Sequence, residues 1–275
     1  MRHTIGIQGV KGSFHHIVTQ QYFENEVAVQ ECASFDKLVQ GLLSNETDAI
    51  VMALENSIAG SIIPNYALID SNNLRIVGEC YLDVQHHLMA LKNQTITDIV
   101  EVYSHPMALL QCKEFFKKHP HIKLIEDSDT AGVAQRIQKE SLKGVAAIAS
   151  KLASELFELD ILAESIQTIK NNETRFVIVE KTKRDLEEAH INKASVKFEL
   201  DHKRGSLATV LNVMSDCKLN LTKIQSLPKI ETPWKYAFFI DVTFDDYRDY
   251  KKAQSLLEIM AEEFKILGEY KNAKQ

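Results

Sequence analysis

Apolar and polar positions follow one pattern from residue 4 to about residue 180. Short β-branched runs end at polar or glycine-containing turns, and segments with helical spacing of apolar residues follow them. The pattern predicts strands at Thr4–Gln8, Val27–Cys32, Ala49–Leu54, Arg75–Tyr81, Ile99–Tyr103, Lys123–Glu126, Val145–Ala149 and Arg175–Glu180. It predicts helices at Phe14–Phe23, Phe35–Leu43, Ala108–His119, Thr130–Glu140 and Lys151–Phe157. This alternation is typical of an open α/β sheet, or of two such sheets.

The pattern changes after a highly charged, apolar-poor stretch at residues 181–193, which suits a linker or a connecting helix. Beyond it the predicted order is strand, helix, strand, strand, helix, strand: Ser195–Leu200, Leu207–Cys217, Leu219–Gln225, Tyr236–Thr243, Tyr250–Phe264 and Lys265–Tyr270. A βαββαβ order is that of a ferredoxin-like domain. We therefore expect an α/β domain at 1–180, a linker at 181–193 and a small domain at 194–275.

Composition and charge exclude several classes of protein. The chain has 275 residues, 25% of them charged, and a formal net charge of −6, so it lacks the cationic excess of a general nucleic-acid binder. No apolar run approaches the ~20 residues that span a bilayer. The N-terminal residues lack the apolar core of a signal peptide, which predicts a cytoplasmic protein without a membrane partner.

Cysteine and histidine usage predicts neither a disulfide framework nor a metal site. The four cysteines are scattered and include no Cys-x-x-Cys pair. The histidine pairs 15–16 and 86–87 are adjacent in sequence, and neighbouring side chains diverge on helices and strands alike.

Candidate chemistry lies where predicted strands end, because open α/β sheets bind ligands at the carboxyl ends of their strands. Ser13, in the turn Gly9-Val10-Lys11-Gly12-Ser13, can cap the next helix or contact a ligand. Glu55, Asn56 and Ser57 form a polar cluster that fits either a turn or a binding site. Ser104 ends a further strand, while Asp129-Thr130-Ala131 is better explained as a helix cap.

Thr174-Arg175-Phe176 leads into the last strand of the α/β region. Arg175 could hold a carboxylate in bidentate fashion, with the Thr174 hydroxyl beside it. The alternative is a surface arginine and a threonine that caps the strand. From these residues alone the two interpretations are equally supported.

Taken together, these motifs resemble the prephenate dehydratase family. The matching segments are Gly9-x-x-Gly12-Ser13-Phe14, Glu55-Asn56-Ser57-x-x-Gly60, His86-x-Leu88, Ser104-His105-Pro106-x-Ala108-Leu109, Asp129-Thr130-Ala131, Ala146-Ala147-Ile148-Ala149-Ser150 and Thr174-Arg175-Phe176. The C-terminal part looks like an ACT domain, through Gly205-Ser206-Leu207 and Asn220-Leu221-Thr222-Lys223-Ile224. Each motif is weak alone, but seven in the family's order are specific.

The resemblance implies two lobes like those of type II periplasmic binding proteins, followed by an ACT domain. The reaction would convert prephenate to phenylpyruvate with loss of water and carbon dioxide, in phenylalanine biosynthesis, with no metal or organic cofactor. Thr174 would be the central catalytic residue, and Arg175, Ser13 and strand-end N–H groups would bind the substrate's anions. The implied site also includes Phe176, Glu55, Asn56, Ser57, Ser104 and His86.

The implied regulation is feedback inhibition by phenylalanine, bound between ACT domains of a homodimer or homotetramer. The implied effector residues are Gly205, Ser206, Leu207, Ala208, Asn220, Leu221, Gln225, Ser226, Leu227 and Pro228. Two of them depart from the family, in which Glu and Arg stand at the positions of Gln225 and Leu227. Val10 and Met107 also replace a frequent Pro and Gln. No separate chorismate mutase domain is expected in this chain.

Three other functions are compatible with parts of the sequence. A solute-binding protein would share the two-lobed fold, although the expected ACT domain argues against it. An arogenate dehydratase would perform the same chemistry on the amino-acid analogue of prephenate, and nothing in the sequence separates the two substrates. A purely regulatory amino-acid sensor would need the Thr174-Arg175-Phe176 set to be inactive.

Overall fold

The computed structural model describes residues 3–24, 27–201, 203–229, 232 and 235–274. The chain divides into two compact units, one made of residues 1–60 and 81–176, the other of residues 61–80 and 177–275. Strands β5 (Arg75–Asp83) and β11 (Glu173–Glu180) run from one unit into the other. The domain boundaries expected at residues 180 and 194 remain a prediction.

The first unit begins with a parallel sheet. Strands β1 (Thr4–Gln8), β2 (Ala28–Cys32) and β3 (Ala49–Asn56) pair in the order β2–β1–β3. Ser13 and Ser34 cap helices α1 (Phe14–Tyr22) and α2 (Phe35–Leu43), which follow the first two strands. Residues 49–54 of β3 are fully buried, so the polar residues that follow begin where the apolar core ends.

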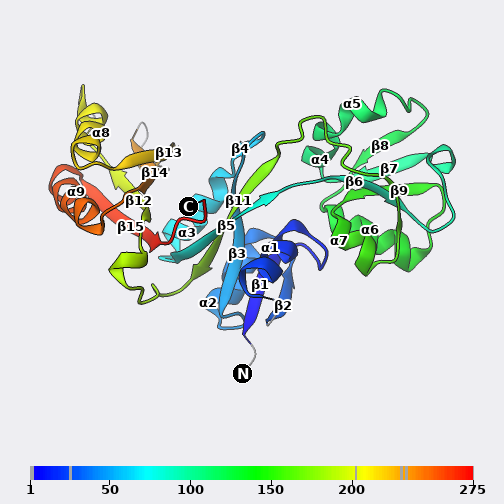
Figure 1. Ribbon diagram of the computed structural model, residues 1–275, viewed down its shortest axis with the longest axis horizontal. Coiled ribbons are helices and arrows are strands. Elements are labelled where there is room, and N and C mark those ends of the chain that lie inside the picture. The colour runs from blue at the N-terminus through cyan, green and yellow to red at the C-terminus, as the bar shows by residue number, and fades with distance from the viewer. Residues whose placement is uncertain (1–2, 25–26, 202, 230–231, 233–234, 275) are drawn as a thin grey trace. The chain divides into compact units, whose positions relative to one another are not determined.

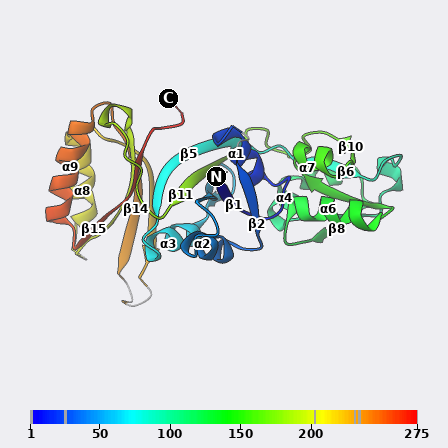
Figure 2. The same cartoon turned by 90° about the horizontal axis from the view of Figure 1, so that it is seen from below.

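A second sheet in the same unit has the order β10–β6–β9–β7–β8. Its strands are β6 (His87–Ala90), β7 (Glu101–Ser104), β8 (Lys123–Glu126), β9 (Val145–Ala149) and β10 (Asp160–Ala163). Its helices are α4 (Pro106–Gln111), α5 (Lys113–Phe116), α6 (Thr130–Glu140) and α7 (Lys151–Leu156), with a 3-10 turn at Ile96–Asp98. Figures 1 and 2 show α6 and α7 together beside this sheet.

Both faces of this second sheet are buried. In β9, Ala146 and Ile148 pack in one core with α4 and α5, whereas Ala147 and Ala149 pack in another with α6 and α7. Successive residues of a strand point to opposite faces, so a continuous apolar run is what a sheet covered on both sides requires.

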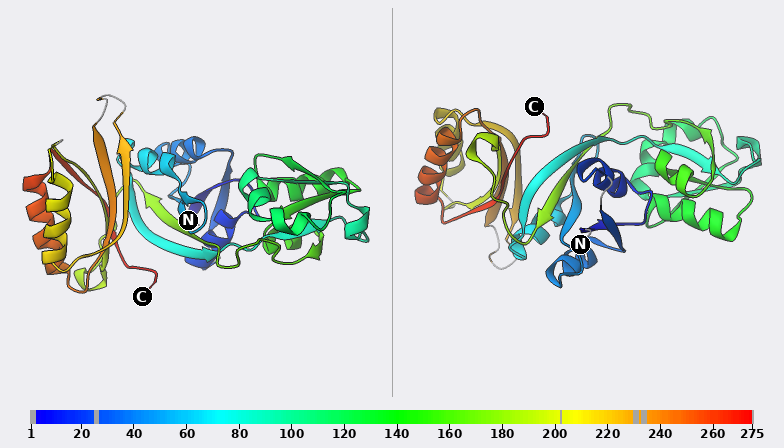
Figure 3. Two further views of the ribbon diagram at one scale, coloured as in Figure 1. Left: turned by 90° about the horizontal axis from the view of Figure 1, so that it is seen from above. Right: turned by 60° about the horizontal axis from the view of Figure 1, so that its bottom comes forward.

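The second unit contains the predicted βαββαβ order. It consists of β12 (Lys193–Glu199), α8 (Ser206–Asp216), β13 (Asn220–Pro228), β14 (Tyr236–Thr243), α9 (Tyr247–Met260) and β15 (Glu263–Tyr270). The sheet order is β13–β14–β12–β15–β5, and α8 and α9 lie side by side on one face (Figure 3). The mixed α/β class with a ferredoxin-like C-terminal part is thereby confirmed.

The other face of this C-terminal sheet is polar and also buried. Along β12, Lys193, Ser195, Lys197 and Glu199 alternate with apolar residues and are all at most 7% exposed. Lys193 pairs with Glu79 of β5 at 2.8 Å, and both side chains are buried. Further ion pairs join this face to α3 (Ile63–Ser71), so residues 61–80 cover the sheet.

Some predicted elements differ from the structure. Helix Ala108–His119 is broken at Cys112, and the carbonyl of Gln111 accepts a hydrogen bond from the backbone of Thr168 instead of continuing the helix. Helix α3 and strands β4 (Gly60–Ser61), β6 and β10 were not predicted. Strand β6 is buried throughout, and the apolar residues of α3 are spread around the helix, so neither has a one-sided pattern.

Residues 181–193 contain only a 3-10 turn at Glu188–His190 before β12 begins at Lys193. The last residue of the predicted linker is therefore part of the C-terminal sheet. Among the described residues, no helix has the length and apolar character needed to span a membrane.

Candidate active site

The polar cluster that ends β3 lies beside the beginning of β11. The backbone N–H of Ser57 donates to the carbonyl of Glu173 at 2.8 Å, and the Ser57 hydroxyl accepts from the Glu173 N–H at 3.0 Å. These bonds join two segments that are 116 residues apart in sequence. As a consequence Asn56 and Thr174, both predicted as site residues, are brought into contact.

The orientation of the Asn56 amide is determined by the backbone that follows it. Its Oδ1 accepts hydrogen bonds from the N–H groups of Ile58, at 3.0 Å, and Ala59, at 2.8 Å. A backbone N–H can only donate, so this atom must be the oxygen. Nδ2 then donates to Oγ1 of Thr174 at 2.9 Å and to Oδ1 of Asn172 at 2.7 Å.

Three further side chains continue this chain of contacts. Nδ2 of Asn172 donates to Oε1 of Gln111 at 2.9 Å, and Nε2 of His86 lies 2.9 Å from the same oxygen. We call Thr174, Asn56, Asn172, Gln111 and His86 the amide network. Asn172 is fully buried and Thr174 is 7% exposed, so the network is shielded from water over most of its length.

Gln111 and Asn172 were missed from the sequence. Gln111 falls in a predicted helix without any adjacent polar motif. The hydrogen bonds of its carbonyl and its side chain go to residues that are distant in sequence, so local pattern could not reveal them. Asn172 stands two residues before Thr174, which places both side chains on the same side of an extended segment. That spacing was the one available signal for Asn172.

His86 is neutral at pH 7. Burial lowers its pKa to about 4, the bond to Gln111 acts in the opposite direction, and His87 and His105 add small lowering effects. Its backbone N–H donates to Oε1 of Gln167 at 3.0 Å. Among described residues Nδ1 of His86 has no hydrogen-bond partner.

Thr174 and Arg175 do not face the same side of β11. Both lie within the strand, where consecutive side chains point to opposite faces, and Thr174 faces Asn56. Arg175 is buried at 3% exposed. The expectation that the two side chains lie side by side is therefore wrong, and the carboxylate-binding role of Arg175 stays a prediction. Glu55 likewise precedes Asn56 within β3 and faces the opposite side.

Phe176 is a core residue. Its ring meets that of His15 edge-on, with centroids 5.0 Å apart, and it is 2% exposed. It supports the strand that carries Thr174.

Ser13 and Ser104 have structural roles in this geometry. The Ser13 hydroxyl caps α1 by accepting from the N–H of His16 at 3.4 Å. The Ser104 hydroxyl is fully buried and donates to the carbonyl of Ile148 at 2.7 Å, which ties β7 to β9. This burial gives no support to a catalytic role for Ser104, which stays a prediction.

The glycine-containing turn at residues 9–13 does not present free N–H groups to an anion. The N–H groups of Gly9, Lys11, Gly12 and Ser13 donate to Cys32, Glu31, His16 and Val10 respectively. Asp129 caps α6 as expected, and burial raises the pKa of its carboxyl group. This turn therefore gives no support to anion binding by strand-end N–H groups, which stays a prediction.

The expected effector residues occupy two regions of the C-terminal unit. Gly205 has a φ of +87° and precedes α8, which begins with Ser206, Leu207 and Ala208. Asn220 and Leu221 begin β13, whereas residues 225–228 end it. Leu221 and Gln225 are four residues apart, about 13 Å along an extended strand, so the two groups lie at separate places on β13.

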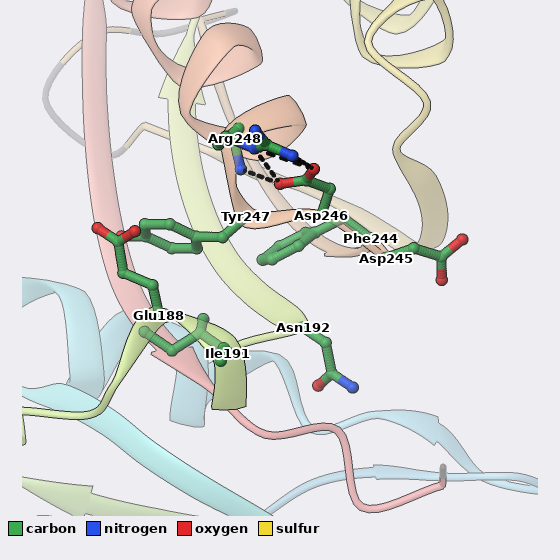
Figure 4. A pocket seen from close by; sticks show the side chains of 9 residues that line it. Glu188, Ile191, Asn192, Phe244, Asp245, Asp246, Tyr247 and Arg248 are labelled. Carbon is green, nitrogen blue, oxygen red and sulfur yellow. Dashed lines mark hydrogen bonds and ion pairs between the residues drawn. The ribbon is translucent and has the colours of Figure 1, made fainter.

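Of two cavities, one lies in the C-terminal unit and the other lies beside His86, whose ring meets that of the lining residue Phe14 edge-on with centroids 5.6 Å apart. One of about 450 Å³ in the C-terminal unit is lined by Phe244, Tyr247, Glu188 and the ion pair of Asp246 with Arg248 (Figure 4). Another of about 260 Å³ lies in the first unit and is lined in part by Phe14, His87 and Lys151. None of the expected effector residues lines the first. Across the described residues, no group of three or more histidine, cysteine or acidic side chains could hold a metal ion.

A hydroxyl and amide network on an α/β sheet, followed by a βαββαβ module, defines the class of the protein. It is an α/β protein with an appended ferredoxin-like module. The chain belongs to the prephenate dehydratase family, which matches residues 5–184 and is a family of carbon–oxygen lyases.

Two relatives with similar sequences are described as prephenate dehydratases, each together with a second activity. The chain is 34% identical over 279 residues to an arogenate dehydratase/prephenate dehydratase of Arabidopsis thaliana, covering 97% of this chain and 72% of the relative. It is 32% identical over 237 residues to a bifunctional chorismate mutase/prephenate dehydratase of Buchnera aphidicola, covering 85% of this chain. The match spans only 62% of that bifunctional relative.

Two solved structures share the whole fold. One, described as GqqA, a quorum quenching acylase, has a TM-score of 0.88 at 25% identity and covers 98% of both chains. The other is a prephenate dehydratase of Arthrobacter aurescens in complex with L-Phe, with a TM-score of 0.89 at 24% identity. It covers 98% of this chain and 90% of that one.

Proposed function

We propose that the chain is a prephenate dehydratase that forms phenylpyruvate in phenylalanine biosynthesis. The observation that carries the proposal is the contact between Asn56 and Thr174, which prepares one hydroxyl for hydrogen bonding to a ligand. Family membership supplies the substrate: prephenate has one ring hydroxyl to lose and a carboxylate to release as carbon dioxide.

The reaction asks for help mainly at the departing oxygen. The ring carboxylate leaves as carbon dioxide, its bonding electrons enter the ring, and the carbon–oxygen bond to the hydroxyl breaks as the ring becomes aromatic. The leaving hydroxide takes a proton and departs as water. A donor that bonds more strongly as negative charge develops on that oxygen lowers the barrier.

Thr174 suits that role because of its partner. Oγ1 accepts from Asn56, so its own proton is available to a ligand. Donation from Asn56 also polarises the hydroxyl and strengthens the bond that it makes in turn. Full proton transfer from a threonine is unfavourable, so Thr174 stabilises the leaving oxygen by a hydrogen bond, and the departing hydroxide is neutralised by a proton from the buffered solvent.

The decisive experiment is phenylpyruvate formation from prephenate by the purified protein and by Thr174→Val. Loss of one such donor lowers the rate about 10²- to 10³-fold, so kcat of the variant should fall by that factor. Thr168→Val is the matched control, because Thr168 is exposed and near Gln111 in the fold. Wild-type turnover with an unaffected Thr174→Val variant would remove Thr174 from the mechanism.

The same assay separates the other candidate functions. Turnover of arogenate in place of prephenate would reassign the substrate. Absence of turnover with both would favour a binding or sensing protein. Amide hydrolysis of an acylated substrate is suggested by the similarity to the acylase. It is disfavoured because an activated nucleophile needs a base beside it, whereas the Thr174 hydroxyl accepts a hydrogen bond from the amide N–H of Asn56, which cannot take up a proton.

We also propose that phenylalanine inhibits the enzyme from a site shared by two copies of the chain. In the described part of the C-terminal sheet, β13 pairs only with β14, which leaves its other edge for a second copy. Antiparallel pairing of two β13 strands would bring Asn220 and Leu221 of one copy toward residues 225–228 of the other. The structure in complex with L-Phe supports phenylalanine as the effector.

The regulatory proposal is tested by equilibrium binding of phenylalanine and by sedimentation. Saturable binding, inhibition and a dimer or larger assembly are expected. A monomer that binds phenylalanine with the same affinity would overturn the shared site. A cytoplasmic location stays a prediction.

A further inference from the structure

The donor and acceptor atoms throughout the amide network are determined by the backbone N–H groups at one end of it. Asn56 Oδ1 is held by the N–H groups of Ile58 and Ala59, neither of which can act as an acceptor. Each later partner is then determined. Asn172 must present its oxygen to Asn56, so its nitrogen faces Gln111 and Gln111 must present its oxygen.

His86 is the last member of the network, and its hydrogen bond to Gln111 determines its tautomer. Oε1 of Gln111 already accepts from Asn172 and can only accept again, so Nε2 of His86 must carry the proton. Nδ1 is then a bare, buried acceptor, in agreement with its having no donor among the described residues. The imidazole therefore acts as a one-way donor at the end of the network.

A reversed network would disable Thr174. If His86 carried its proton on Nδ1, Gln111 could turn its nitrogen toward the bare Nε2 and toward Asn172. Asn172 would then present its oxygen to Gln111 and its nitrogen to Asn56, where two nitrogens would meet. Asn56 would have to move away from Asn172 or turn its oxygen from Ile58 and Ala59, and Thr174 would lose its donor.

We propose that Asn172 and His86 are positioning residues that keep the Asn56 nitrogen on Thr174, with His86 held as the Nε2–H tautomer. The proposal rests on the proposed function for its catalytic consequence but not for the geometry. Neither residue needs to touch the substrate: His86 acts through Gln111, Asn172 and Asn56 in turn. The proposal thus gives His86 a function at the site that does not require it to act as an acid or a base.

The tautomer is measured directly by ¹⁵N NMR of the histidine ring nitrogens in the unliganded, full-length protein. The expected result for His86 is a protonated Nε2 and an unprotonated Nδ1 at pH 7. A protonated Nδ1 in the wild-type protein would overturn the proposal, whatever the enzyme's activity. Assignment uses the signal that disappears in His86→Gln.

Asn172→Ala tests the coupling to Thr174. Removing the donor to Gln111 frees that amide to turn, so the His86 signals should show a mixture of tautomers. Because Asn56 also loses a partner, kcat should fall about 10- to 100-fold with KM little changed, as for a small misplacement of a catalytic group. A purely structural role would not shift the tautomer.

Asn171→Ala is the matched control, since it removes the same side chain one residue earlier from an exposed position. It should retain the wild-type tautomer and kcat. An unchanged tautomer and kcat in Asn172→Ala would contradict the proposal. If the wild type shows the Nε2–H tautomer but turns over neither prephenate nor arogenate, the proposed function fails while the network geometry stands.

Discussion

Acid should destabilise the first unit through His15, which the proposed mechanism does not use. The imidazole is buried in α1 between Phe176 and Phe35, with ring centroids 5.0 and 5.7 Å away. Burial alone lowers its pKa to about 4 from the usual 6.5. No charged neighbour contributes to this shift, so the effect is one of desolvation.

The sign and size follow from proton linkage. Between pH 6.5 and 4 the unfolded chain binds a proton at His15, whereas His15 of the folded chain stays neutral. The free energy of unfolding therefore falls as the pH falls. The full difference corresponds to about 3 kcal/mol, of which about 2 kcal/mol is lost between pH 7.5 and pH 5. Nothing further is lost from His15 below its folded pKa.

The assay is urea unfolding followed by far-UV circular dichroism at pH 7.5 and pH 5, for wild type and His15→Phe. The variant keeps an aromatic ring against Phe176 but cannot titrate. All other groups cancel in the comparison, so the variant should lose about 2 kcal/mol less than the wild type on acidification. Equal losses in the two proteins would refute the reasoning, whatever their stabilities at pH 7.5.

Three substitutions test other contacts. Lys193→Met leaves the Glu79 carboxylate buried without its partner and should lower the unfolding free energy by about 3–5 kcal/mol, and Glu79→Gln in the same protein should restore most of it. No restoration in urea titrations would contradict a charge effect. Gly12→Ala should cost about 1–3 kcal/mol, because Gly12 has a φ of +92° and a Cβ would lie 3.0 Å from the Ala153 backbone. A thermal midpoint equal to that of wild type would disprove this strain. Ser104→Ala should cost about 1–3 kcal/mol but keep the kcat of the folded enzyme, and a kcat loss above tenfold would return Ser104 to the catalytic set.

Local pattern was sufficient for much of the fold. Strands β1, β8, β9 and β14 and helices α2 and α6 have the predicted bounds, because each combines a clear apolar periodicity with a capping residue or a turn. The elements that were missed lack that signal. Strand β6 is buried on both faces, and the apolar residues of α3 do not form a single face, so the formation of both elements depends on what packs around them.

The site divides in the same way. Asn56 and Thr174 could be named from sequence because a hydroxyl and an amide at strand ends are unusual and match the family motifs. Ser104 was chosen by the same reasoning, yet its hydroxyl donates a hydrogen bond to the carbonyl of Ile148 inside the protein. Motif identity specifies which functional groups are present, but hydrogen-bond partners decide which of them remain available to a substrate.

The sequence by itself determined the α/β class, the βαββαβ end of the chain, the family and the two side chains on which the proposed chemistry depends. Those properties follow from residue spacing and residue type, which are local. Only the tertiary structure decided that Asn56 meets Thr174 across 118 residues, and that Gln111 and Asn172 link them to His86. It also decided that Thr174 and Arg175 face opposite ways, since strand pleat and pairing, rather than adjacency along the chain, determine where a side chain points.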